Sequence, residues 1–133
     1  MRPAASHSLT PFCRRPPDPV LLQAVAAFNA RAYWDCHYLL EPLWLADRNP
    51  TRDFFKGLIQ VAGGLYHVDR NNRAGAVSLL HKGPAYLRPF APQCQGLDVA
   101  ACRIQAAAVL EFVQAVPPAL PLPALPDTLR PRL

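Results

Sequence analysis

Apolar side chains recur at intervals of three and four residues along the middle of the chain, the spacing that places them on one face of an α-helix. Segments with this spacing run over residues 19–28, 32–45, 51–69, 73–82 and 97–116. Gly83-Pro84 is expected to end the fourth helix, so that residues 85–90 add at most one further turn. No stretch shows the strict apolar–polar alternation of a half-buried strand. The pattern therefore predicts an all-α fold, a compact array of about five helices.

The segment over about residues 51–69 is apolar on nearly every face, which is typical of a helix that other helices surround. It also contains Gly57, Gly63 and Gly64, although each glycine costs roughly 1 kcal/mol relative to alanine in a helix interior. We therefore expect the third helix to be central and buried, with its glycines at points where neighbouring backbones approach closely.

Prolines divide the chain into three parts. Ten of the sixteen lie in residues 1–18 and 117–133, and they leave a middle that can be helical. We expect a flexible N-terminal segment rich in proline and arginine over residues 1–18, and a single helical domain over residues 19–116. Residues 117–133 are expected to form a proline-rich tail that is flexible or lies along the surface. Asp18-Pro19 supplies an N-cap and a first helical residue for the first helix.

Charge and cysteine content exclude several classes of protein. The formal charge is +5, but residues 19–116 hold nine cationic and seven acidic side chains in mixed order, so no basic groove for nucleic acid is expected. No apolar run approaches the ~20 residues of a membrane helix, and no signal-peptide core is evident. The four cysteines form no CxxC pair and no dense disulfide pattern, and Cys36 is expected to be a buried thiol. These features predict a soluble cytoplasmic protein without a cofactor.

The candidate chemistry lies in YWDCHYLLEPLW, residues 33–44. His37 and Glu41 stand four residues apart, so they share one helix face and can reach a common atom. Trp44 continues that face, and Pro42 removes a backbone hydrogen bond just beyond the pair. This face is therefore the first place to look for a binding or catalytic site.

An antiparallel hairpin of the second and third helices adds residues to this pair. Counted from a loop midpoint near residue 49 at ~1.5 Å of rise per residue, Gln60 comes level with Tyr38, beside His37, and Lys56 comes level with Pro42, beside Glu41. His67 falls ~9 Å along the axis from His37. We therefore predict a cluster of His37, Glu41 and Gln60, with Lys56 at its edge, rather than a site that His67 shares.

Three blocks of the sequence resemble a known family. FNARAYWDCHYLLEPLW, RDFFKGLIQVAGGLYH and NNRAGAVSLL follow one another in the order and spacing of domain-of-unknown-function family 309, small helical proteins mainly of bacteria and archaea. The matching positions are Phe28, Asn29, Asp35, His37, Glu41, Trp44, Arg52, Gly57, Leu58, Ile59, Gln60, Tyr66, His67, Asn72, Gly75, Ala76, Leu79 and Leu80. Arg31 and Tyr38 depart from a glycine and a glutamate that are frequent in the family. The resemblance covers about residues 25–82; it implies an all-α fold and makes Asp35 a further candidate, but it implies no activity.

Two kinds of function remain open for the cluster. In the first, the protein is a non-enzymatic helical module that binds an unknown protein or a small-molecule ligand. His37, Glu41 and Gln60 then form a buried hydrogen-bonded network, because an unpaired buried polar group costs ~1–3 kcal/mol, or they recognise the ligand. In the second, a small metal-dependent or hydrolase-like enzyme is centred on His37 and Glu41. These two residues fall short of the three ligands of a zinc site, so no metal is expected. A nucleophile–base pair needs Ser, Cys or Lys near His37, and the adjacent Cys36 points about 100° away around the helix.

Secondary candidates lie at the ends of the third helix. Tyr66 and His67 are expected to form a capping or surface pair near its end. Arg52 is expected to pair with Asp53 in a surface salt bridge worth ~0–1 kcal/mol. Two tryptophans on the second helix are compatible with a homodimer face.

Overall fold

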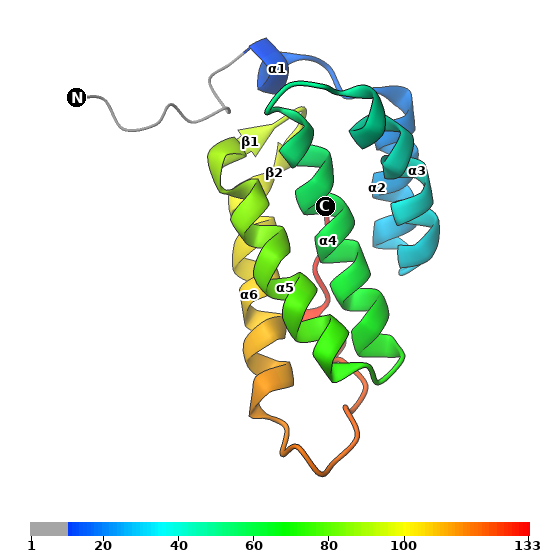
Figure 1. The fold of residues 1–133 in the computed structure, drawn as a ribbon, viewed down its shortest axis with the longest axis vertical. Coiled ribbons are helices and arrows are strands. Elements are labelled where there is room, and N and C mark those ends of the chain that lie inside the picture. Colours follow the sequence, from blue (N-terminus) through cyan, green and yellow to red (C-terminus); the bar gives the residue numbers. More distant parts are fainter. Residues whose placement is uncertain (1–10) are drawn as a thin grey trace, which may run out of the picture.

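The computed structural model describes residues 11–133 and is built from helices (Figure 1). The helices are α1 (Pro11–Arg14), α2 (Pro19–Asn29), α3 (Tyr33–Ala46), α4 (Arg52–Asp69), α5 (Arg73–Leu87) and α6 (Val99–Ala115). Short 3-10 turns, η2 and η3, cover Arg88–Phe90 and Asp127–Leu129, and the two-residue strands β1 (Gln93–Cys94) and β2 (Leu97–Asp98) pair antiparallel. The predicted all-α fold is confirmed. Within the described residues, no helix is long and apolar enough to span a membrane.

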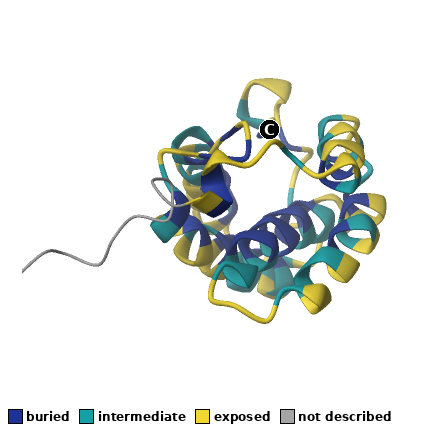
Figure 2. Ribbon diagram, turned by 90° about the horizontal axis from the view of Figure 1, so that it is seen from above, coloured by how far each residue is buried: buried dark blue, intermediate teal, exposed yellow. Residues whose placement is uncertain are grey.

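Helix α4 lies at the centre of the array, with α3 on one side and α5 on the other (Figure 1). Buried residues are concentrated on it (Figure 2). The predicted close approaches occur where α5 lies on α4. A Cβ on Gly57 would lie 2.5 Å from Cγ of Leu87, and one on Gly64 would lie 2.7 Å from Cγ of Leu80. The glycines therefore let the backbones of the two helices come together.

The predicted break at Gly83-Pro84 is wrong, because α5 continues to Leu87. Gly83 lies directly against α4, where an added Cβ would be 2.9 Å from the backbone nitrogen of Val61. Leu80 and Leu87 are fully buried on either side of the proline. Their packing holds the helix together, although Pro84 lacks one backbone hydrogen bond.

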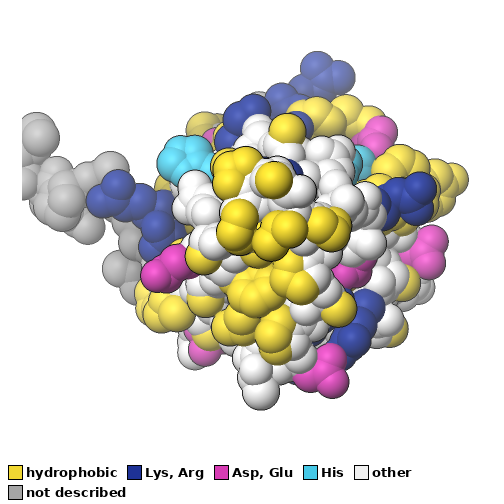
Figure 3. Space-filling view, turned by 90° about the horizontal axis from the view of Figure 1, so that it is seen from below, with side chains coloured by type: hydrophobic (Ala, Val, Ile, Leu, Met, Phe, Trp, Pro, Cys, Tyr) yellow, Lys and Arg dark blue, Asp and Glu magenta, His cyan; other side chains and the backbone are white. Residues whose placement is uncertain are grey.

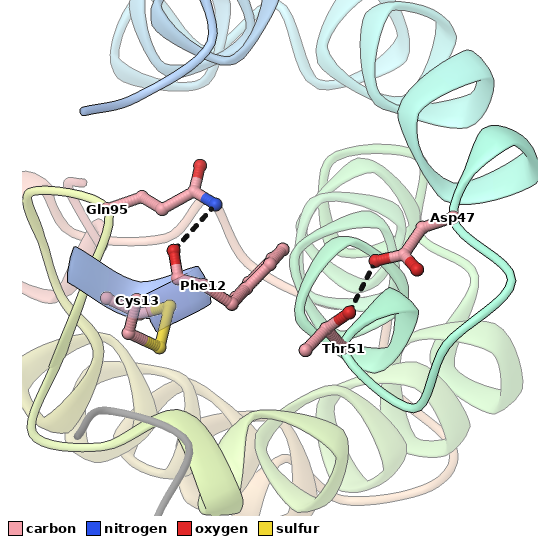
Figure 4. Close-up of a disulfide and its surroundings, with 6 residues drawn as sticks. Phe12, Cys13, Asp47, Thr51 and Gln95 are labelled. Atoms are coloured by element: carbon pink, nitrogen blue, oxygen red, sulfur yellow. Dashed lines mark hydrogen bonds between the residues drawn. A yellow bond between two sulfur atoms is a disulfide. The ribbon is translucent and has the colours of Figure 1, made fainter. Parts of the chain in front are cut away.

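The segment expected to be flexible contains ordered structure close to the core. Residues 1–10 lie outside the described part of the chain. In α1, Phe12 is buried and its ring lies 5.7 Å from that of Phe54. Cys13 forms a disulfide with Cys94 (Figure 4), and the amide of Gln95 donates to the carbonyl of Phe12 at 3.2 Å. Residues 11–14 therefore pack against the core, and the flexibility expected for residues 1–18 stays a prediction.

The proline-rich tail lies along the body of the protein. It leaves α6 at an apolar end of the molecule (Figure 3), where Phe112, Val116, Pro117, Leu120 and Leu122 line a shallow groove. It then returns past α4, where the guanidinium of Arg130 donates to both carboxylate oxygens of Asp69, at 2.7 and 3.1 Å. Leu133 exchanges two hydrogen bonds with the side chain of Asn29. The tail is therefore attached to α2 and α4.

Candidate functional site

A pocket of about 200 Å³ opens between α3 and α4, with one wall from α5. Its lining residues are Tyr33, Trp34, His37, Trp44, Lys56, Ile59, Gln60, Gly63, Tyr66, His67 and Leu79. Six of the candidates expected from sequence therefore share one pocket. Asp35 does not belong to it, because its side chain is exposed in the first turn of α3.

Aromatic rings form most of the outer wall. The ring of Trp34 lies 5.4 Å from that of His37 and 5.7 Å from that of Tyr66, so it bridges α3 and α4. Trp34 is 59% exposed, although large aromatic side chains are usually well buried. Trp34 is not among the site candidates expected from the sequence. A signal existed, because Trp34, His37, Glu41 and Trp44 follow one another at spacings of three, four and three residues along one helix face.

His37, which lines the pocket, contacts Glu41, which is not among the lining residues. Nε2 of His37 lies 3.3 Å from a carboxylate oxygen of Glu41, and the two side chains are 34% and 48% exposed. The network expected to be buried is therefore open to solvent, and no hydrogen bond links either residue to Gln60 within residues 11–133. An exposed pair of this kind is worth ~0–1 kcal/mol, so it contributes little to stability.

Gln60 has a buried side-chain oxygen without a hydrogen-bond partner among residues 11–133. A buried polar atom without a partner costs ~1–3 kcal/mol. The register predicted for the hairpin did bring Gln60 into one pocket with His37. Their side chains are not bonded to each other, however, and because the Gln60 oxygen is buried, it meets a hydrogen-bond donor in the pocket only when the carboxamide turns toward it.

His67 lies at the opposite end of the pocket from Lys56 along α4, and its tautomer follows from its neighbours. The carbonyl oxygen of the Asn72 side chain accepts from the backbone N–H of Gly75 at 3.0 Å. The NH₂ group of Asn72 therefore lies toward Nδ1 of His67, at 3.2 Å. Nδ1 accepts this bond, so Nε2 of the neutral ring carries the proton and can donate. His67 and His37 both line this pocket, and the prediction that His67 does not share the His37 cluster stays a prediction.

Two cations lie against Trp44. The ammonium nitrogen of Lys56 is 4.4 Å from the indole centroid, and the guanidinium carbon of Arg52 is 4.9 Å from it. Nε of Arg52 is buried without a hydrogen-bond partner among residues 11–133. The expected salt bridge between Arg52 and Asp53 is absent from the described residues, because Arg52 turns to the indole face instead.

Tyr33 connects the pocket to the tail. Its hydroxyl oxygen accepts a hydrogen bond from Arg130 at 3.3 Å, and its ring lines the pocket. Burial raises the pKa of the Tyr33 phenol, and the hydrogen bond and positive charge of Arg130 partly offset that rise. Among residues 11–133, no group of three or more His, Cys, Asp or Glu side chains is placed to hold a metal ion.

Fold and pocket together define a small helical-array domain with an aromatic pocket between two antiparallel helices. Residues 21–79 match the family model described as Domain of unknown function (DUF309), which confirms the resemblance over those residues. This span contains every residue that lines the pocket. The chain is also 43% identical over 51 residues to "Uncharacterized protein YpuF" of Bacillus subtilis (strain 168). That match covers 38% of this chain and 29% of the relative, so the chain corresponds to less than a third of that protein's length.

Proposed function

We propose that the protein is a non-enzymatic binding module that takes up a small, flat organic molecule in the pocket between α3 and α4. The observation that carries this proposal is the buried, unpartnered carboxamide oxygen of Gln60 within an aromatic pocket. A ligand that donates a hydrogen bond there removes the cost of the unpaired oxygen. The rings of Trp34 and Tyr66 offer flat faces on which a planar molecule can stack.

The size of the pocket limits the ligand to about one ring. Liquid water occupies ~30 Å³ per molecule, so about 200 Å³ corresponds to a small cluster of waters. Pockets for drug-sized molecules usually begin at ~300 Å³. A single aromatic ring with one or two substituents therefore fits the available space better than a nucleotide or a peptide.

Binding is favoured over catalysis by what the pocket lacks. No serine, threonine or cysteine lines it. Burial raises the pKa of the Cys36 thiol to about 12, so that thiol is not a nucleophile at neutral pH. The ammonium group of Lys56, on α4, lies against the Trp44 ring rather than against His37.

The alternative is a hydrolase-like enzyme in which His37, held by Glu41, activates a water molecule. The 3.3 Å contact between these side chains supports this candidate, because a carboxylate that holds a histidine is a common general-base arrangement. Hydrolysis of activated phenyl esters separates the two functions. If the protein is an enzyme, wild type should turn the esters over and His37→Gln should abolish this turnover. If it is a binding module, wild type and His37→Gln should hydrolyse the esters at the same slow rate.

The binding proposal is tested with Gln60→Leu, which removes the amide and keeps the volume. We expect this variant to be more stable than wild type by ~1 kcal/mol, because no buried group is then left unpaired. It should also lose the binding of single-ring compounds detected by saturation-transfer NMR. Gln23→Leu, the same change at an exposed position of α2, is the matched control and should alter neither property. A destabilised Gln60→Leu variant would instead support the hydrogen-bonded network predicted from sequence.

The cytoplasmic location and the homodimer stay predictions. Disulfides such as Cys13–Cys94 form mainly in oxidising compartments. Trapping thiols during cell lysis would therefore bear on location, since a cytoplasmic protein should yield four modified cysteines.

A further inference from the structure

The side of α4 that faces the pocket has a regular polar order. Arg52, Lys56 and Gln60 follow one another at intervals of four residues, and His67 continues the row past Gly63. The cationic end of this row lies against Trp44. The row therefore runs from two positive charges, past a buried acceptor, to the Nε2–H donor of a histidine.

The positive charges along this row are not neutralised within the described part of the chain. Neither Arg52 nor Lys56 forms an ion pair with a carboxylate of residues 11–133. Near the other end, the guanidinium of Arg70 lies 5.3 Å from the Tyr66 ring centroid. Asp69 already pairs with Arg130 of the tail, and Glu41, which contacts His37, leaves one carboxylate against these three cations. The pocket surroundings thus carry an excess of positive charge.

We propose that the ligand is a small aromatic carboxylate whose ring carries a hydrogen-bond donor. This inference rests on the proposed binding function and names its ligand class. The carboxylate lies at Lys56, whose ammonium group still has N–H donors to offer, and Arg52, which contacts Trp44 without lining the pocket itself, adds a second positive charge nearby. The ring lies between Trp44 and the Trp34–Tyr66 wall, and its hydroxyl or amino group donates to the Gln60 oxygen.

The spacing of the row fits such a molecule. Lys56 and Gln60 are four residues apart, which is ~6 Å along a helix. That is close to the length of a benzene ring with a polar group at each end. A neutral molecule of the same shape leaves the two cations unpaired, and a cationic one is repelled by them.

The experiment compares three probes that differ mainly in charge. 4-Hydroxybenzoate, 4-hydroxybenzamide and 4-hydroxybenzylamine are titrated into the full chain and followed by tryptophan fluorescence and calorimetry. We expect the carboxylate to bind about tenfold or more tightly than the amide, as one charge-assisted bond implies, and the amine to bind most weakly. Lys56→Gln should bring the carboxylate down to the level of the amide, and Lys56→Arg should keep the preference. Lys82→Gln on α5 outside the pocket is the matched control and should change nothing.

The outcomes separate the ligand class from the binding function. Equal binding of carboxylate and amide, or a preference unaffected by Lys56→Gln, overturns the anionic ligand and leaves the binding module intact. Tighter binding of phenyl phosphate than of 4-hydroxybenzoate assigns the cations to a phosphate and overturns the carboxylate. Absence of binding by every single-ring compound, charged or neutral, overturns the binding function itself.

Discussion

Gly83 and Gly63 both lie in the contact between α4 and α5, but an added methyl group would meet different atoms at each. At Gly83, on α5, a Cβ would lie 2.9 Å from the backbone nitrogen of Val61 and 2.7 Å from its Cγ2. At Gly63, on α4, the Cβ would lie 2.9 Å from Cδ1 of Leu79, the end of a flexible side chain. One substitution must displace a helix backbone, whereas the other must turn a leucine.

The size of the two effects follows from this difference. Alanine is better than glycine by about 1 kcal/mol in a helix interior, a gain that Gly63→Ala makes in full. Gly83→Ala makes only part of it, because Pro84 disfavours helical backbone at a preceding residue that carries a Cβ. Overpacking a well-packed core typically costs ~1–3 kcal/mol, and the upper part of that range applies where backbone must move. We therefore expect Gly83→Ala to lower the free energy of unfolding by ~1–2 kcal/mol. Gly63→Ala should leave it unchanged or raise it by up to ~1 kcal/mol.

Urea unfolding followed by far-ultraviolet circular dichroism measures both free energies against wild type. The unfolding slope should be the same in the three proteins, so a difference in midpoint reports stability. The two alanine variants should differ by roughly 2 kcal/mol, which corresponds to several degrees in Tm. Equal midpoints, or a Gly83→Ala variant more stable than wild type, would refute the close backbone contact between α4 and α5.

Three further predictions concern parts of the structure outside the helix contact. Protein purified without reductant and then denatured should expose two titratable thiols, and four thiols would contradict the Cys13–Cys94 pairing. Replacing both cysteines by serine should lower the free energy of unfolding by about 4.5 kcal/mol, because the disulfide closes a loop of 81 residues. Arg130→Met removes the paired bonds to Asp69 and should speed amide exchange in the tail by about tenfold or more, with a loss of ~1–2 kcal/mol; unchanged exchange would show that the tail is held by other contacts. Burial raises the pKa of Tyr33 above 10.0, so the folded state holds the phenolic proton more tightly and the stability of the fold should fall as pH rises above that value. Absorbance titration of wild type against Tyr33→Phe measures this pKa, and a difference curve centred below 10.0 would refute the prediction.

Local signals in the sequence were sufficient for most of the fold. Asp18 caps α2 as predicted, since its carboxylate accepts from the backbone N–H of Val20 at 2.7 Å. The antiparallel register, counted from the loop near residue 49, brought Gln60 and Lys56 into the same pocket as His37. Helix period and helix rise fix such positions to within a turn, because both are properties of the backbone rather than of its surroundings.

The errors arose where distant contacts override local signals. Gly83-Pro84 is a strong helix breaker locally, yet α5 continues through it because the helix packs against α4. The bond between Cys13 and Cys94 depends on two segments 81 residues apart, and nothing in their spacing indicates the pairing. The exposure of His37 depends on how far α3 stands from α4, a quantity that hydrophobic periodicity does not contain.

Gly63 and Gln60 give the strongest reason to regard the pocket as functional rather than as a defect of packing. A glycine in the interior of α4 costs about 1 kcal/mol, and its added Cβ would meet just the end of Leu79. The unpartnered oxygen of Gln60 costs ~1–3 kcal/mol more. The other close-packed glycines of this contact are explained by backbone approach, but these two residues lower stability without a compensating contact in residues 11–133. Natural proteins break the local rules of stability mainly at functional or strained sites. The stabilities of Gly63→Ala and Gln60→Leu therefore measure how much the glycine and the glutamine at these two positions lower the free energy of unfolding.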